Sequence, residues 1–290
     1  MKKIFCLVFV LCLASSLLMG CSEKQKETPS PASDFEYIKG DTFVVLSKYL
    51  GEDNRVIVPA EIEGLPVTRI NSFFISNSNV EYVSLPDTVT RINLQAFFAN
   101  EKLLEVHLGN AITEIDGGAF HYCTALKKIN FPSSLKTIGV QAFRCCSSLE
   151  EVILPEGLES IGNYAFAECT SVKNIFIPKT VTNWGMFTFA QNQSLQSITF
   201  DDGIQTIGNM ADFSGASMLE SVTIPSSVTA IGDSVFADCA SLKTVAFLGD
   251  APEKIGFEVF GKNESISVYY SKDASNWEDT PLNKYNLIEQ

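Results

Sequence analysis

The chain has 290 residues, of which 46% are hydrophobic, and a formal net charge of −13. This length and composition are sufficient for a sizeable hydrophobic core. The acidic balance and the lack of any basic run longer than two residues disfavour nucleic acid as a partner, because binding to a phosphate backbone needs clustered Lys and Arg.

The N-terminus has the features of an export signal. Two lysines precede an apolar run over residues 4–19, which is too short and wrongly flanked for a stable membrane span. The run ends in Leu-Met-Gly-Cys at residues 18–21, which resembles a bacterial lipobox. That resemblance implies that residues 1–20 are a lipoprotein signal peptide, with cleavage before Cys21 and a lipid on its sulfur. The alternative is an ordinary secretory signal in which Cys21 is incidental.

Residues 22–33 read SEKQKETPSPAS, with two prolines and no aromatic side chain. Such a composition is typical of a disordered linker, so we interpret residues 21–33 as a lipidated cysteine and its tether. Fully extended, the twelve residues after Cys21 would reach at most ~40 Å. The expected location is therefore the bacterial cell envelope, lipid-anchored and exposed outside the cytoplasm.

Residues 34–66 precede the regular part of the sequence. Strands are predicted over residues 43–46 and 55–59, with a turn over residues 51–54 between them. We interpret this region as an N-terminal hairpin cap followed by an enlarged first repeat. A cap is expected because the open end of a repeat structure exposes core side chains and a strand edge.

From residue 67 to residue 270 the sequence repeats every 23 or 24 residues. Apolar residues 9 and 11 positions after the first eight phenylalanines of this repeat alternate with polar ones, which predicts one short strand per repeat with the apolar pair inward. A fixed period in the twenties is typical of a leucine-rich-repeat solenoid. The period is set by Phe74, Phe97, Phe120, Phe143, Phe166, Phe189, Phe213, Phe236 and Phe260.

These features together predict the fold. An Ile-Gly step before the phenylalanine, as at Ile138-Gly139, is expected to turn the chain into a short helical segment. Several strands are followed by proline, which lacks an N–H donor and so ends the hydrogen bonding between strands. We predict an α/β-type repeat solenoid with a curved parallel β-sheet, short helical or 3₁₀ turns opposite it, and caps at both ends. The aperiodic residues 271–290 form the expected C-terminal cap, with Trp277 covering the last coil.

The pattern IG..AF..C..L..I..P, seen at residues 138–155 with Val152 in place of the last isoleucine, resembles the BspA-type leucine-rich repeat of bacterial surface proteins, which is related to treponemal repeats. The resemblance covers roughly residues 56–270. It implies a surface-exposed or secreted protein that binds macromolecules of a host or a neighbouring cell. It supplies no catalytic residue.

Four cysteines occupy the position three residues after a repeat phenylalanine: Cys123, Cys146, Cys169 and Cys239. We expect them to form an inward structural ladder, because a free cysteine is readily buried. One cysteine per 23 residues lacks the close spacing of a metal site, and parallel side-chain vectors disfavour disulfides. Cys145 lies off this row and is predicted to be the most exposed thiol.

Catalysis is not expected from this sequence. It contains two histidines and none of the common hydrolase, metalloprotease or phosphate-loop motifs, and no metal or cofactor is predicted. A glycosidase pair of carboxylates stays open as an alternative, because two such groups need only meet in space.

A binding face is predicted on the strands, at the positions 8 and 10 residues after the phenylalanines. These positions point outward, and Ile153 and Phe176 place two apolar side chains side by side. The plain alternative is that β-branched and aromatic residues simply suit strands, where two exposed apolar residues are ordinary. The candidate residues are Tyr82, Glu105, His107, Lys128, Asn130, Glu151, Ile153, Asn174, Phe176 and Thr199.

The sequence thus favours a membrane-anchored surface module that binds a protein or glycan of a host or neighbouring cell in an adhesion-like manner. A structural or assembly component of the cell envelope is the second hypothesis, and a carbohydrate-active enzyme is the third.

Overall fold

The computed structural model describes residues 28–72, 74 and 79–290. The predicted signal peptide, Cys21 and residues 22–27 of the predicted tether lie outside the described residues. Lipidation of Cys21 therefore stays a prediction.

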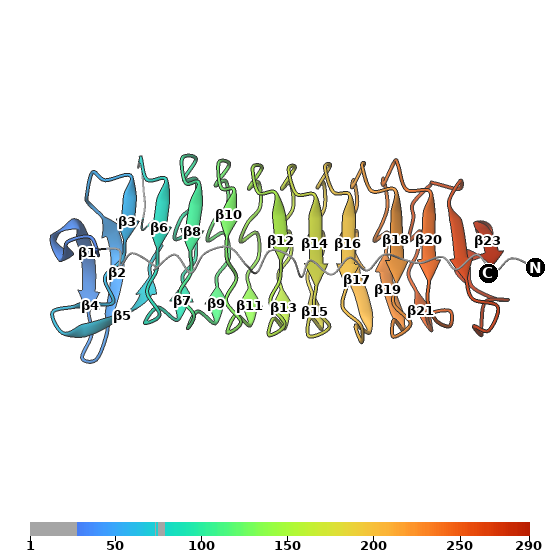
Figure 1. Ribbon diagram of the computed structural model, residues 1–290, viewed down its shortest axis with the longest axis horizontal. Coiled ribbons are helices and arrows are strands. Elements are labelled where there is room, and N and C mark those ends of the chain that lie inside the picture. Colours follow the sequence, from blue (N-terminus) through green and yellow to red (C-terminus); the bar gives the residue numbers. More distant parts are fainter. Residues whose placement is uncertain (1–27, 73, 75–78) are drawn as a thin grey trace, which may run out of the picture.

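The described chain is a solenoid of about ten coils with two rows of short strands stacked along one axis (Figure 1). Most strands pair in parallel with the equivalent strand one coil away. The first row, which contains the strand predicted for each repeat, consists of β3 (Arg55–Ile57), β6 (Tyr82–Ser84), β8 (Glu105–His107), β10 (Lys128–Ile129), β12 (Glu151–Ile153), β14 (Asn174–Ile177), β16 (Ser197–Phe200), β18 (Ser221–Ile224), β20 (Thr244–Phe247), β22 (Ser267–Tyr270) and β23 (Asn286–Glu289).

A second row of strands lies at the Ile-Gly steps, where a turn was expected. The isoleucine is the last residue of a two-residue strand in several coils, and the following glycine passes close to the preceding coil. A Cβ added at Gly139 would lie 2.5 Å from the backbone nitrogen of Gly117, so only glycine fits there. This row consists of β1 (Phe35–Lys39), β2 (Val44–Tyr49), β5 (Leu65–Ile70), β7 (Arg91–Ile92), β9 (Glu114–Ile115), β11 (Thr137–Ile138), β13 (Ser160–Ile161), β15 (Asn183–Trp184), β17 (Thr206–Met210), β19 (Ala230–Asp233) and β21 (Lys254–Ile255), with β4 (Glu61–Ile62) antiparallel to β5.

The segments that carry the phenylalanines are hydrogen-bonded turns, where the sequence predicted short helical or 3₁₀ turns. Between Gly118 and Cys123, odd-numbered N–H groups donate to the carbonyl three residues back, and even-numbered ones donate to the next coil. A helix would take all of them locally and leave the next coil unpaired. In the described residues, 3₁₀ helices occur only near the ends, at η1 (Ala32–Asp34) and η2 (Pro281–Lys284).

Alternation of this kind requires left-handed backbone at two positions per coil. From the Phe97 coil to the Phe236 coil, the residues two before and two after the phenylalanine have positive φ. Gln95 and Ala99 have φ of 55° and 57°, and Tyr164 and Glu168 have φ of 57° and 62°. For residues other than glycine, such backbone costs about 1 kcal/mol or more per position, which the bonds between coils offset.

The phenylalanine row forms the centre of the core. All nine rings are at most 1% exposed. From Phe97 to Phe236 consecutive rings stack almost parallel, with centroids 4.9 Å apart for Phe97 and Phe120 and 5.0 Å apart for Phe143 and Phe166, whereas Phe74 meets Phe97 edge-on. These separations fit offset-stacked aromatic pairs, so the ring spacing matches the distance between paired strands.

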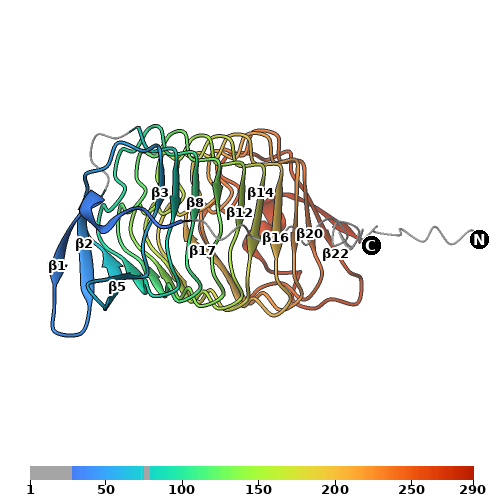
Figure 2. The same ribbon diagram turned by 60° about the vertical axis from the view of Figure 1, so that its left-hand side comes forward.

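Both ends of the core are covered. At the N-terminal end the antiparallel hairpin β1–β2 places Phe35 against Phe74, with ring centroids 6.1 Å apart. At the C-terminal end Trp277 is 4% exposed and packs between Phe247 and Tyr270. Strand β23 extends the first row beyond β22, although the sequence around it has no repeat pattern. Figure 2 shows the hairpin projecting at the blue end.

The Phe213 coil has one extra residue between its isoleucine and its phenylalanine, and a buried carboxylate accepts the backbone donors that this insertion displaces. The register shifts between Ile207 and Met210, where β17 pairs with β19. The Asp212 carboxylate, fully buried, accepts the N–H groups of Asn209, Met210 and Thr188 at 2.5, 3.1 and 2.9 Å. Burial raises the pKa of Asp212, and these bonds partly offset that rise. Asp212 thus satisfies the donors that the bulge displaces from the ladder.

We expect Ala99→Gly to raise the free energy of unfolding by about 0.5–1 kcal/mol, because glycine adopts positive φ without steric cost. The measurement is urea unfolding followed by circular dichroism. The control is Ala111→Gly, which removes a methyl group from a residue with negative φ and should lose about 0.5–1 kcal/mol. Equal losses in both variants would contradict the strain argument.

Asp212→Asn should lower the free energy of unfolding by about 1–3 kcal/mol, although it preserves the size of the side chain. Both carboxylate oxygens accept backbone N–H groups, so the amide NH₂ of asparagine must face at least one donor. Asp202→Asn, at an exposed residue of a neighbouring loop, serves as the control in the same unfolding assay. If both variants unfold at the same urea concentration, Asp212 does not support the bulge.

Candidate interaction surfaces

The predicted binding residues lie on the outer face of the first strand row. In its central sheet, Ile153 on β12, Phe176 on β14 and Thr199 on β16 are in register. Ile153 is 57% exposed, Phe176 is half-buried, and Glu151 and Asn174 beside them are exposed. This part of the face therefore has an apolar centre with polar neighbours.

Nearer the N-terminus the same face is more polar and more occupied by internal contacts. Tyr82, Glu105 and Lys128 are in register across β6, β8 and β10. The His107 ring lies 5.3 Å from the Tyr82 ring, and its Nε2 is 2.9 Å from Glu105 Oε1. The Arg55 guanidinium lies 3.5 Å from the centre of the Tyr82 ring. A ligand here would compete with these contacts.

A shallow hollow of about 230 Å³ lies between these two parts, where the first row is interrupted between β10 and β12. It is lined by Glu105, His107, Lys128 and Glu151, among others. Asn130 is tied to the backbone: its side-chain oxygen accepts from Leu108 N at 2.9 Å, and its nitrogen donates to Leu108 O at 3.2 Å. The amide thus takes the place of ladder bonds where β10 ends.

The cysteine row faces the interior. Each of the four thiols donates to the carbonyl of the phenylalanine one coil earlier, at 3.0–3.3 Å. All are free thiols, and burial raises the pKa of Cys123 and of Cys239 to about 12. Cys145 is the most exposed of the five described thiols, as predicted, but it is still buried, with 9% exposed and its Sγ 3.6 Å from Glu168 Oε2.

Among the described residues, no group of three or more His, Cys, Asp or Glu side chains is placed to hold a metal ion. In the same part of the chain, no helix is long and apolar enough to cross a membrane. The structure therefore offers surfaces for contact and no assembled metal centre in its described residues.

A second exposed surface lies on the phenylalanine turns and was not predicted. The Tyr164 and Phe187 rings stack 5.0 Å apart, and Met210 and Phe257 follow along the axis. Together they line a hollow of about 600 Å³. The signal was present in the sequence as apolar residues two or three positions before the buried phenylalanines, but their direction depends on the left-handed backbone.

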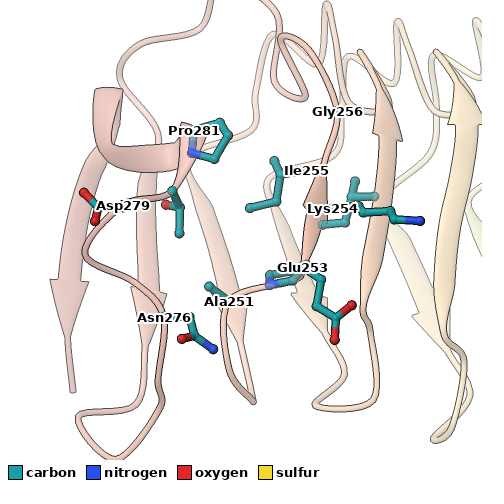
Figure 3. A pocket seen from close by; sticks show the side chains of 11 residues that line it. Ala251, Glu253, Lys254, Ile255, Gly256, Asn276, Asp279 and Pro281 are labelled. Carbon is teal, nitrogen blue, oxygen red and sulfur yellow. The ribbon is translucent and has the colours of Figure 1, made fainter.

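A further hollow of about 600 Å³ lies at the C-terminal end of the second row, beside β21. In the preceding coil the carbonyls of Thr229 and Ile231 accept N–H groups from β21 and its next residue. No described strand pairs with the other edge of β21. Ile255 and Pro281 face each other across this hollow, whereas Lys254 extends away from it (Figure 3).

Comparison with known proteins identifies the repeat. A family model described as "BspA type Leucine rich repeat region (6 copies)" matches residues 68–191 and 137–267. No curated protein matches this sequence.

Solved structures of bacterial leucine-rich repeat proteins share the fold. A T. pallidum leucine-rich repeat protein is 28% identical with a TM-score of 0.61, over 74% of this chain and 91% of that one. A leucine-rich repeat protein from Bacteroides ovatus is 25% identical with a TM-score of 0.58, over 82% of this chain and 70% of that one. Since the family model covers more than half of the sequence, this chain belongs to the BspA-type leucine-rich repeat family.

Proposed function

We propose that this protein is a cell-surface module, held to the membrane by a lipid on Cys21, that binds a protein or glycan of a host or neighbouring cell without catalysis. Membership of a family of protein-binding repeat proteins supports the binding role. The lipobox-like sequence at residues 18–21 supports the anchor. The observation that carries the proposal is the in-register row Ile153–Phe176–Thr199 on the exposed sheet.

This face is built for contact with a large partner. Outward side chains repeat about every 4.8 Å along the axis on backbone that is fixed by the ladder. Rigid side-chain platforms lose little conformational freedom on binding, which leaves more of the contact energy for affinity. An apolar centre surrounded by polar side chains is the usual arrangement of a protein interface.

For the anchor, Cys21→Ser should move the protein from the membrane fraction to the soluble fraction, because only a thiol can form the thioether to the lipid. Partition into detergent phase and the mass of the mature N-terminus are the readouts, with Cys145→Ser as the matched control. A Cys21→Ser protein that still partitions with membranes would contradict lipid anchoring.

For the binding face, the combined change Ile153→Ala and Phe176→Ala should weaken binding to a captured ligand about 10- to 100-fold, since apolar anchors contribute most interface energy. The purified protein is applied to an array of matrix proteins, mucins and glycans, and each saturable hit is titrated with both forms. Leu94→Ala, which truncates another exposed apolar residue away from this face, is the control.

Unchanged affinity in the double variant would show that the sheet face is not the binding surface. Silence across the array, with capture of a protein from the cell's own envelope, would instead favour a structural or assembly role.

A further inference from the structure

The hollow on the phenylalanine turns, here called the turn-face groove, has aromatic ends and a floor of small residues. The stacked rings of Tyr164 and Phe187 lie at one end and Phe257 at the other. Phe187 and Phe257 are three coils apart, which corresponds to about 14 Å at the spacing of paired strands. The floor between them is formed by small side chains on successive coils: Ala190, Ala211, Ser214, Ser234 and Ala237. The part of the groove between Phe187 and Phe257 therefore has the length of about four extended residues.

The walls of the groove are apolar and open to solvent. Phe257 is 72% exposed and Met210 is 37% exposed, and both are on segments held by hydrogen bonds between coils. An aromatic side chain this exposed contributes little to the core. It is the type of residue that dominates the energy of an interface when a partner covers it.

Two carboxylates at the Phe257 end give the groove its charge. Asp233 and Asp238 both line it, and neither forms an ion pair with any described residue. Asp233 Oδ1 accepts the N–H of Phe257 at 2.7 Å, which holds the carboxylate against the aromatic residue. The charge of this end is complementary to a cation.

At its other end the same surface already holds a guanidinium. Arg144 donates Nε and Nη2 to Glu168 Oε1 at 3.0 and 2.6 Å, and its guanidinium lies 5.5 Å from the centre of the Tyr164 ring. The Tyr164 ring and the Glu168 carboxylate thus already bind a guanidinium, that of the chain's own Arg144. Phe257 and Asp233 likewise place an aromatic ring beside a carboxylate, but no described arginine or lysine forms an ion pair or a cation–π contact with them.

Strand addition is not available in the groove. The N–H groups of Gln191, Ala211 and Ser234, which line the groove, donate to carbonyls of the next coil. A partner must therefore be recognised by its side chains.

We propose that the turn-face groove binds an arginine-bearing extended segment of a partner protein, with guanidinium groups at Phe257 and the two aspartates and an apolar side chain on the floor. Cation–π contact and charge-assisted hydrogen bonds would supply the specificity. This inference goes beyond the proposed function, because it concerns another face and depends neither on the lipid anchor nor on Ile153 and Phe176.

The test uses the end-blocked, fluorescein-labelled pentapeptide Arg-Phe-Arg-Leu-Arg, titrated with the purified protein and followed by fluorescence anisotropy. Saturable binding should weaken about tenfold in Phe257→Ala. It should weaken by a similar factor in the combined change Asp233→Asn and Asp238→Asn, and at high salt, which screens exposed charges. The two asparagines remove charge at constant size, so they keep the test valid if Phe257→Ala unfolds.

The sheet-face variant Ile153→Ala with Phe176→Ala should bind the peptide with unchanged affinity, which separates this proposal from the proposed function. Equal binding of the peptide Glu-Phe-Glu-Leu-Glu, or equal affinity in the two-asparagine variant, would overturn the proposal. Absence of saturable binding to the arginine peptide would also overturn it.

Discussion

The structure depends on the pairing of each coil with the next at a fixed offset in sequence. Because backbone N–H groups of one coil donate to carbonyls one repeat earlier or later, every coil must have the same path. That constraint explains the parallel stacking of the phenylalanines, the glycine that follows the isoleucine, and the left-handed residues around each turn. Where the Phe213 coil has an extra residue before its phenylalanine, the Asp212 carboxylate satisfies the displaced donors, so the irregularity stays local.

The periodic part of the fold could be predicted from the sequence because its side chains repeat. The phenylalanine side chains point inward in each coil, and the side chains of the strands alternate between inward and outward. Their burial can therefore be predicted from their position in the repeat. The second strand row could not be predicted in this way, since two-residue strands leave no alternation to detect. Strand β23 was missed because its neighbour β22 provides an edge, whereas its own sequence has no repeat.

The candidate surfaces show the same division. Alternation predicts that Ile153 and Asn174 point outward, but it cannot show that Asn130 is tied to Leu108 or that His107 contacts Glu105 and Tyr82. Those contacts depend on where a ladder breaks and on distances between coils. The turn-face groove was missed for another reason: the direction of Phe187 is set by a φ of 56°, which sequence propensity does not favour in a phenylalanine.

The buried cysteines would have a consequence for folding if the chain is exported as proposed. Oxidation and thiol exchange require a thiolate, and burial raises the pKa of Cys123 to about 12 while removing it from solvent. Once folded, such thiols are inert in an oxidising compartment and need no partner. Before folding they are exposed and reactive. In the proposed location outside the cytoplasm, the chain would have to fold faster than oxidants react with its thiols, so the redox conditions there would set a time limit on its folding.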